Sequence, residues 1–303
     1  MTDQANPASP NEPQPKVSTR WGQDRRLAFI DYRLQWDGRI NRSNLTDFFN
    51  ISIPQASLDL ARYMDMAPGN LVYDRSSRTY LVTPEFRPLV TSTHSQRYLD
   101  DLGALAAGRL EPESAFVGWR PPTASVPLVG RVVPATILAS LISAMRDVSG
   151  IRVLYQSMSS PEPTSRVITP HALAHDGFRW HVRAYCHSRS RFLDFVLGRI
   201  LAIQDHEKAG PTVSDDHEWN TILGLVLAAN PALPDAQQRA IELDYGMVDG
   251  EIRLECRQAL LFYTIKRYGL QHWGTEPAPL SQHVVLKNNQ EILPLVASAA
   301  VQR

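Results

Sequence analysis

The sequence predicts a multidomain α+β protein with a helical N-terminal part and an antiparallel β-sheet in the middle. Three short helical patterns followed by a hairpin occupy residues 24–82, and alternating apolar strands occupy residues 151–200. Beyond His206 helical and strand patterns are mixed. We therefore expect an N-terminal winged helix-turn-helix, a central small β-barrel and a C-terminal α+β module, in that order.

Composition limits the classes of protein that this chain can belong to. Its 303 residues are enough for two or three domains. The 31 basic and 31 acidic residues balance, so binding to nucleic acid must use local patches and not a global positive field. Cys186 and Cys256 lie far apart with no second thiol near either, which suggests neither a disulfide framework nor a zinc site. We predict no metal and no cofactor.

The first segment, residues 1–20, is predicted to be a disordered tail. It carries four prolines among polar residues and lacks the apolar core of a signal peptide. No apolar run elsewhere approaches the roughly 18 residues of a membrane span. We expect a cytoplasmic protein without a membrane partner.

Residues 21–90 are predicted to form the winged helix-turn-helix. A helix begins near Asp24 and ends near Gly38, a second follows Asn41, and Ser52 begins a third. Ser52 and Gln55 have the spacing of a capping box, and a proline lies in the first turn of this third helix. The period predicts Ala56, Leu60 and Tyr63 facing inward, and an outward face formed by Gln55, Ser57, Asp59 and Arg62.

A hairpin after the third helix would form the wing, with Arg75 and Arg78 near its tip. A helix of this kind can enter the major groove, where glutamine suits adenine and arginine suits guanine or phosphate. The start of the second helix can hold phosphate through its free N–H groups. The predicted DNA-binding residues are Asn41, Arg42, Ser43, Ser52, Gln55, Ser57, Arg62, Arg75 and Arg78. Winged helices also mediate protein contacts, which is the alternative for this surface.

Residues 91–133 are predicted to be a linker, with a helix over 93–107 and an extended crossing after it. The next domain, residues 134–205, begins with a helix over 134–150 that has proline at its start and glycine at its end. Turn signals then separate four strands of a small barrel. These strands are expected at residues 151–158, 166–173, 178–186 and 192–200.

The third of these strands sorts its side chains into two chemically opposite faces. Phe178, Trp180, Val182 and Ala184 alternate with Arg179, His181, Arg183 and Tyr185, so the first set is expected in the core. Between residues 166 and 199 there are six arginines and four histidines against two aspartates. Arginine holds phosphate or carboxylate at two points, which favours an anion site. The alternative is an exposed sheet face whose arginines pair with carboxylates elsewhere.

Residues 206–303 are predicted to form the C-terminal α+β module. Its pattern gives a helix over 216–229, strands at 241–245 and 251–256, a helix over 258–268 and a last strand at 284–286. No catalytic or ligand-binding pattern occurs in it. We expect this extension to serve in dimerisation or to cover the barrel.

Together these residues resemble a known family. The run Trp180-His181-Val182, preceded by Gly177 and followed by Arg183-Ala-Tyr-Cys and by Asp194-Phe-Val-Leu-Gly-Arg, resembles the WYL domain of bacterial regulators. His181 and Val182 stand where the eponymous motif has tyrosine and leucine. With the winged helix before it and the extension after it, the chain resembles WYL-domain transcriptional regulators of the BrxR/CapW type, found beside anti-phage defence systems.

The resemblance implies a five-stranded Sm-like or SH3-like barrel that senses a nucleotide or single-stranded nucleic acid in a basic pocket. The matching positions on the four expected strands would be Tyr155, Ser157, His171, His181, Arg183, Arg191 and Arg199.

We therefore predict a homodimeric, sequence-specific repressor of a defence operon that binds double-stranded DNA at an inverted-repeat operator and responds to an anionic effector. Two other classes of function are weighed against it. One is a single-stranded nucleic-acid-binding module. The other is a nucleic-acid-processing enzyme, but the sequence has no Walker A, GxSxG or HExxH pattern and no catalytic residues are predicted.

Overall fold

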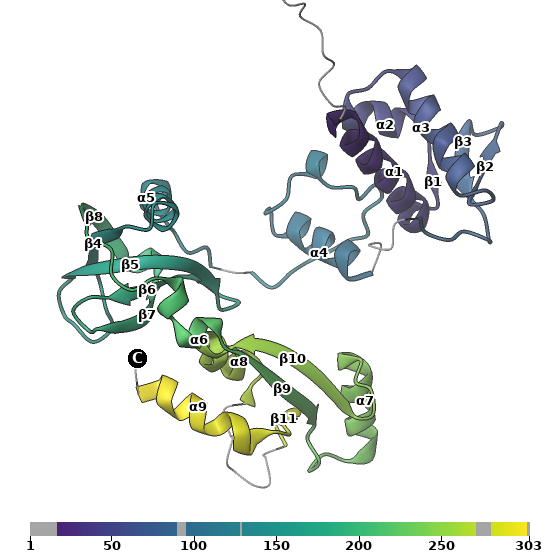
Figure 1. Cartoon of the computed structure of the whole chain (residues 1–303). Coiled ribbons are helices and arrows are strands. Elements are labelled where there is room, and N and C mark those ends of the chain that lie inside the picture. Colours follow the sequence, from purple (N-terminus) through teal and green to yellow (C-terminus); the bar gives the residue numbers. More distant parts are fainter. Residues whose placement is uncertain (1–16, 90–94, 128, 271–279, 302–303) are drawn as a thin grey trace, which may run out of the picture. The chain divides into compact units, whose positions relative to one another are not determined.

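A computed structural model describes residues 17–89, 95–127, 129–270 and 280–301. The chain divides into two compact units, residues 1–129 and 130–303, each of which is described by itself (Figure 1). Among the described residues, no helix is long and apolar enough to cross a membrane.

The first unit has the element order of a winged helix. Three helices are followed by a β-hairpin. A short strand between the first and second helices pairs with this hairpin, which gives a three-stranded antiparallel sheet in the order β1-β3-β2. A further helix and a 3-10 turn follow the wing. The elements are α1 (Val17–Asp37), β1 (Arg39–Ile40), α2 (Arg42–Phe49), α3 (Ile53–Met66), β2 (Leu71–Asp74), β3 (Thr79–Val82), α4 (Ser95–Ala106) and η1 (Pro112–Ser114).

Helix α1 begins earlier than the sequence pattern indicated. Residues 17–20, expected at the end of the disordered tail, belong to this helix, and residues 1–16 lie outside the described residues. The predicted start at Asp24 marks only where the apolar stripe begins.

The core of the first unit includes residues from the predicted linker. The ring of Phe116, which follows α4, lies 5.2 Å from that of Phe29 on α1 and 5.3 Å from that of Phe48 on α2. Leu102 of α4 is buried in the same cluster. Residues 95–117 thus add to the winged-helix core, where the sequence alone indicated a separate connection.

One residue of α3 has the opposite orientation to the prediction. Asp59, expected to face outward, is fully buried and accepts from Arg26 Nε of α1 at 2.6 Å. Ala56, Leu60 and Tyr63 are buried as expected. The helical period could not find this ion pair, because the partner lies 33 residues away on a different helix. It holds the third helix against the first.

The second unit begins with a helix and a five-stranded antiparallel sheet in the order β7-β6-β5-β4-β8 (Figure 1). Its core includes Ile151, Val153, Val182 and Ala184, all fully buried. The fifth strand, β8, was not separated from the fourth in the sequence pattern, although the family resemblance implied it. The elements are α5 (Ala135–Arg146), β4 (Gly150–Tyr155), β5 (Thr164–His175), β6 (Trp180–Cys186), β7 (Arg191–Val196), η2 (Leu197–Arg199) and β8 (Ile200–Glu207).

Two aromatic residues expected in this core are exposed instead. Phe178 is 68% exposed and Trp180 is 50% exposed. Phe178 lies in the turn before β6, and Trp180 is the first residue of that strand, where its ring packs on His175. Of the predicted apolar face only Val182 and Ala184 are buried, and His181 and Arg183 of the opposite face are buried as well.

The C-terminal module differs from the prediction in three places, one of which is the helix α9 that follows the last expected strand. Residues 222–229 form a central strand and not a helix, and residues 241–245 end a helix and are not a strand. The strands 251–257 and 284–286 are confirmed. The elements are η3 (Val213–Asp215), α6 (His217–Asn220), β9 (Ile222–Ala229), α7 (Asp235–Tyr245), β10 (Glu251–Arg257), η4 (Gln258–Leu260), α8 (Leu261–Arg267), β11 (Val284–Leu286) and α9 (Asn289–Val301).

Candidate nucleic-acid interface and ligand cavity

The exposed face of α3 presents one cation and several apolar side chains. Arg62 is exposed, as are Ile53 and Leu58. Ser52 caps the helix, its hydroxyl accepting from the Gln55 backbone N–H at 3.3 Å. The Gln55 side-chain amide donates to buried Asp59 at 3.2 Å, so this side chain is already held by the fold. Arg62 is thus the more available of the two predicted base-reading residues.

Arg42 and Ser57 make contacts with each other and with the wing. Arg42 Nε donates to the Ser57 hydroxyl at 2.9 Å, and the same guanidinium donates to the Tyr80 hydroxyl at 3.1 Å. Its carbon also lies 5.8 Å from the centre of the Tyr73 ring. The arginine therefore joins α2, α3 and the wing. Its Nε and Nη2 donate within the protein, so the predicted phosphate contact would use the other N–H groups of the guanidinium.

The start of α2 is a complete capping box. Asn41 accepts from the Asn44 backbone N–H at 3.0 Å, and the Asn44 side chain accepts from the Asn41 backbone N–H at 2.9 Å. The Ser43 hydroxyl donates to the Asn41 side chain at 2.6 Å. These side chains fix the helix terminus, where first-turn N–H groups have no partner within the helix and suit an anion.

The wing turn is organised by a carboxylate and carries two exposed arginines. Asp74 accepts from the hydroxyl and backbone groups of Ser76 and Ser77, which lowers its pKa to about 2. Arg75 and Arg78 are both exposed, and Arg78 adopts a left-handed backbone with φ 53°. The tight turn projects both side chains at the tip, as the sequence predicted.

The second unit contains a cavity of about 910 Å³ with a strongly cationic wall. Nine lysine or arginine side chains and only three carboxylates line it. Six of the seven predicted ligand residues line it: Tyr155, Ser157, His181, Arg183, Arg191 and Arg199. Arg166, Arg179 and Arg189, which belong to the arginine-rich segment noted in the sequence, also line the cavity, and no sequence pattern indicated a contribution from Arg131, Tyr263, Lys266 and Arg267.

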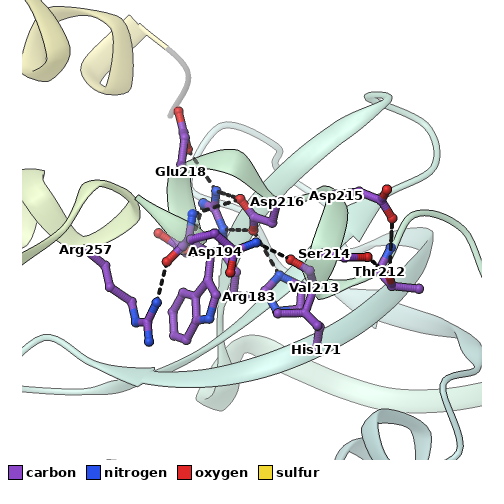
Figure 2. Close-up of polar contacts among 12 residues, drawn as sticks. His171, Arg183, Asp194, Thr212, Val213, Ser214, Asp215, Asp216, Glu218 and Arg257 are labelled. Carbon is purple, nitrogen blue, oxygen red and sulfur yellow. Dashed lines mark hydrogen bonds and ion pairs between the residues drawn. The ribbon is translucent and has the colours of Figure 1, made fainter. Parts of the chain in front are cut away.

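Arg183 lies at the floor of this cavity, but carboxylates surround it (Figure 2). Its side chain is 4% exposed; Nε and Nη2 donate to Asp216 at 2.8 and 3.0 Å, Nη1 to Asp194 at 3.3 Å and Nη2 to Glu218 at 2.8 Å. Burial alone would lower the pKa of this guanidinium, but the hydrogen bonds that it donates to Asp216 and Glu218, and the negative charge of Asp194, hold the pKa above its usual value. Arg183 therefore has few donors left for a ligand, and its predicted role in ligand binding stays a prediction.

The predicted histidines are also engaged internally. His171 does not line the cavity; its Nε2 lies 2.9 Å from Asp216, and its ring packs on Trp219. His181 Nε2 lies 3.0 Å from Asp176 and its Nδ1 3.3 Å from the Tyr263 hydroxyl. The alternation of strand β6 grouped His181 with Arg183 but could not identify their carboxylate partners, which are Asp176 for His181 and Asp194, Asp216 and Glu218 for Arg183. His171, His181 and Arg183 thus position the wall of the cavity.

Burial and hydrogen bonding shift two pKa values in this network in the same direction. Burial lowers the pKa of His181, although Asp176 opposes the shift. Burial alone would raise the pKa of Asp176, but hydrogen bonds from His181 and two backbone N–H groups outweigh it and lower the pKa to about 2. His181 is therefore neutral and Asp176 ionised at pH 7.

We expect acid to destabilise the second unit in two steps. Below a pH of about 6.5 the unfolded chain binds a proton at His181, whereas the folded protein does not, because its His181 pKa is lower. Between a pH of about 4 and about 2 the unfolded chain likewise binds a proton at Asp176, whereas the folded protein keeps this carboxylate ionised. The free energy of unfolding thus falls as the pH falls. Urea denaturation between pH 7 and 5 tests the first step. His181→Gln should flatten this dependence and the exposed-site control His206→Gln should not; equal slopes in all three proteins would contradict it.

Comparison with known families defines the class of this protein. Residues 22–104 match the BrxR transcriptional regulator winged helix-turn-helix domain, residues 136–205 match the WYL domain, and residues 222–292 match the BrxR transcriptional regulator C-terminal dimerization domain. The chain is thus a winged-helix regulator with a central WYL domain and a C-terminal dimerization domain. The predicted order of domains is confirmed.

Full-length relatives identify the family more closely. The DNA-binding transcriptional repressor CapW of Escherichia coli strain KTE188 is 47% identical over 284 residues, covering 93% of this chain and 94% of that protein. CapW of Stenotrophomonas maltophilia is 48% identical over 274 residues (90% and 92%), and CapW of Pseudomonas aeruginosa is 45% identical over 302 residues (98% and 99%). The chain therefore belongs to the BrxR/CapW family of WYL-domain transcriptional regulators. These names describe regulators and not enzymes, in agreement with the sequence prediction.

Proposed function

We propose that this protein is a homodimeric DNA-binding transcriptional repressor whose DNA binding is controlled by an anionic effector in the WYL-domain cavity. The single observation that carries the proposal is the cavity itself, in which nine cations face three carboxylates. It belongs to the second unit, whereas α3 and the wing belong to the first. The names of the CapW relatives support the repressor, and the C-terminal dimerization domain supports the dimer.

The proposed DNA surface consists of α3, the start of α2 and the wing. Arg62 would read the major groove, while the N–H groups of α2 and the arginines of the wing would hold phosphates. Two such surfaces in a two-fold dimer match an inverted-repeat operator.

We expect Arg62→Ala to weaken operator binding by about 1–3 kcal/mol, because it removes an exposed base-reading cation. Gln55→Ala should cost less, since that side chain already bonds Asp59. Fluorescence anisotropy with the operator duplex measures both, and Arg109→Ala, which removes an exposed cation of the same unit beyond α4, is the control. An Arg62 variant as tight as the Arg109 control would remove this residue from the DNA surface.

The wing arginines should behave differently from Arg62. Arg75→Ala and Arg78→Ala are expected to weaken binding to operator and unrelated duplexes alike, and each should lower the slope of log affinity against log salt by about one. Titrations at several salt concentrations measure this. A loss confined to the operator would show base reading by the wing instead.

The effector would be a nucleotide or a single-stranded nucleic acid, because clustered arginines suit phosphate groups and the exposed ring of Phe178 at the cavity wall can stack on a base. We further propose that the repressed genes belong to an anti-phage defence operon. This step rests on the family to which the chain belongs.

One selection experiment tests the proposed function as a whole. Double-stranded DNA that co-purifies with the protein from a random library is sequenced, and the selection is repeated with short single-stranded oligonucleotides present. We expect one inverted-repeat motif, enriched in the first selection and depleted in the second. No enriched motif would contradict sequence-specific binding, and enrichment of single strands alone would favour the single-stranded nucleic-acid-binding module.

A further inference from the structure

One wall of the cavity comes from helix α8, which lies outside the β-sheet that carries the predicted ligand residues. Tyr263, Lys266 and Arg267 all line the cavity. Their spacing of three and four residues places them on one face of the helix. Part of the cavity lining is thus a helical face with two positive charges.

Direct contacts fix this helix against the strands. The Tyr263 hydroxyl donates to Asp194 of β7 at 3.2 Å and lies 3.3 Å from His181 Nδ1 of β6. The rings of Tyr263 and His181 are 4.8 Å apart. Arg267 covers the turn before β6 so closely that a Cβ on Gly177 would collide with its guanidinium. The position of α8 is therefore coupled to the strands that carry the arginines.

The two walls belong to different domains. The strands lie in the WYL domain, residues 136–205, and α8 lies in the C-terminal dimerization domain, residues 222–292. We propose that Lys266 and Arg267 bind an anionic group of the effector, so that the effector bridges the WYL and dimerization domains of one protomer. This inference rests on the proposed effector site and adds to it the residues through which occupancy would act on the dimer.

The expected size of the effect follows from the charges involved. A hydrogen bond between a cation and an anionic group contributes enough for about a tenfold change in affinity when one partner is removed. Both side chains are exposed along part of their length, so Ala substitutions should leave the fold intact. Lys266→Ala and Arg267→Ala are therefore expected to weaken effector binding without disturbing the winged helix.

Fluorescein-labelled oligothymidylate is the probe, used with the full-length protein in an anisotropy titration. The variants are Lys266→Ala and Arg267→Ala in the helical wall, Arg199→Ala in the barrel wall and Arg253→Ala as the control. Arg253 is an exposed cation of the same dimerization domain that does not line the cavity. Light scattering confirms that each variant keeps the oligomeric state of the parent.

We expect about tenfold weaker binding for both α8 variants and for Arg199→Ala, with the Arg253 control unchanged. Loss in Arg199→Ala alone would overturn the bridging proposal and leave the barrel site standing. No binding by the parent, or no loss in any variant, would overturn the effector site and the bridge together. Hydrogen exchange gives a second readout: the oligonucleotide should protect residues 261–267 along with strands β6 and β7, and protection of the strands alone would contradict bridging.

Discussion

Arg183→Ala is expected to lower the free energy of unfolding of the second unit by about 3–5 kcal/mol. The substitution leaves Asp194, Asp216 and Glu218 without their shared cation, and the first two are almost completely buried. Removing one partner of a buried ion pair costs more than the pair contributed, because the remaining charge stays desolvated. The lost free energy of unfolding includes two contacts between elements, because Arg183 joins strand β6 to the start of helix α6 through Asp216 and Glu218.

Urea denaturation followed by tryptophan fluorescence measures this loss. Arg189→Ala, which removes an exposed cation of the same cavity, is the matched control and should change stability by about 0.5 kcal/mol or less. Similar midpoints for the two variants would show that the network contributes little. A destabilised Arg183 variant would also explain any loss of effector response without direct contact between this residue and the effector.

The second large effect is expected on DNA. An operator with both half-sites should bind the full-length protein about 100 to 10 000 times more tightly than a duplex with one half-site, because the second contact becomes intramolecular. Inserting about five base pairs between the half-sites turns one of them to the opposite side of the duplex and should abolish the gain. This advantage comes from the dimer and not from additional base contacts.

Competition titrations with the three duplexes measure it, and light scattering gives the stoichiometry. The insertion duplex serves as the control, since it keeps both half-sites and changes only their phase. Equal affinities for all three duplexes, or one protomer on the intact operator, would contradict the homodimeric repressor.

The order of the domains could be predicted from the sequence, because caps and periodicity are local. Ser52 with Pro54 marked the start of α3, and residues 284–286 were correctly assigned as a strand. Residues 222–229 were wrongly assigned to a helix, because a short apolar run has no periodicity that separates strand from helix. What makes this run a strand is its pairing with β10 and β11, which lie further along the chain. The sequence signals of α7 were present but missed: Pro234 at its start and Gly246 in a left-handed conformation at its end.

From the sequence it could be predicted which charged residues lie near the candidate ligand site, but not which of their side chains are accessible to a ligand. Alternation correctly grouped His181 with Arg183, but their burial depends on Asp216 and Tyr263, which lie 33 and 82 residues further along the chain. The same pattern assigned Phe178 to the core, whereas this residue lies outside the strand. Lys266 and Arg267 carried no local signal, since a basic helix end is common on protein surfaces. Tertiary contacts decide these positions.

The central claim, that effector sensing and DNA binding use different surfaces, is tested most directly by one measurement. Operator affinity is determined with and without oligothymidylate for the parent protein and for Arg191→Ala and Arg199→Ala. We predict operator affinities close to that of the parent without the oligonucleotide, and a loss of its effect in both variants, because a protein that cannot hold the effector cannot shift its population. Operator affinity that falls with each lost charge, while the response to the oligonucleotide persists, would contradict the account and assign the cavity to the DNA surface.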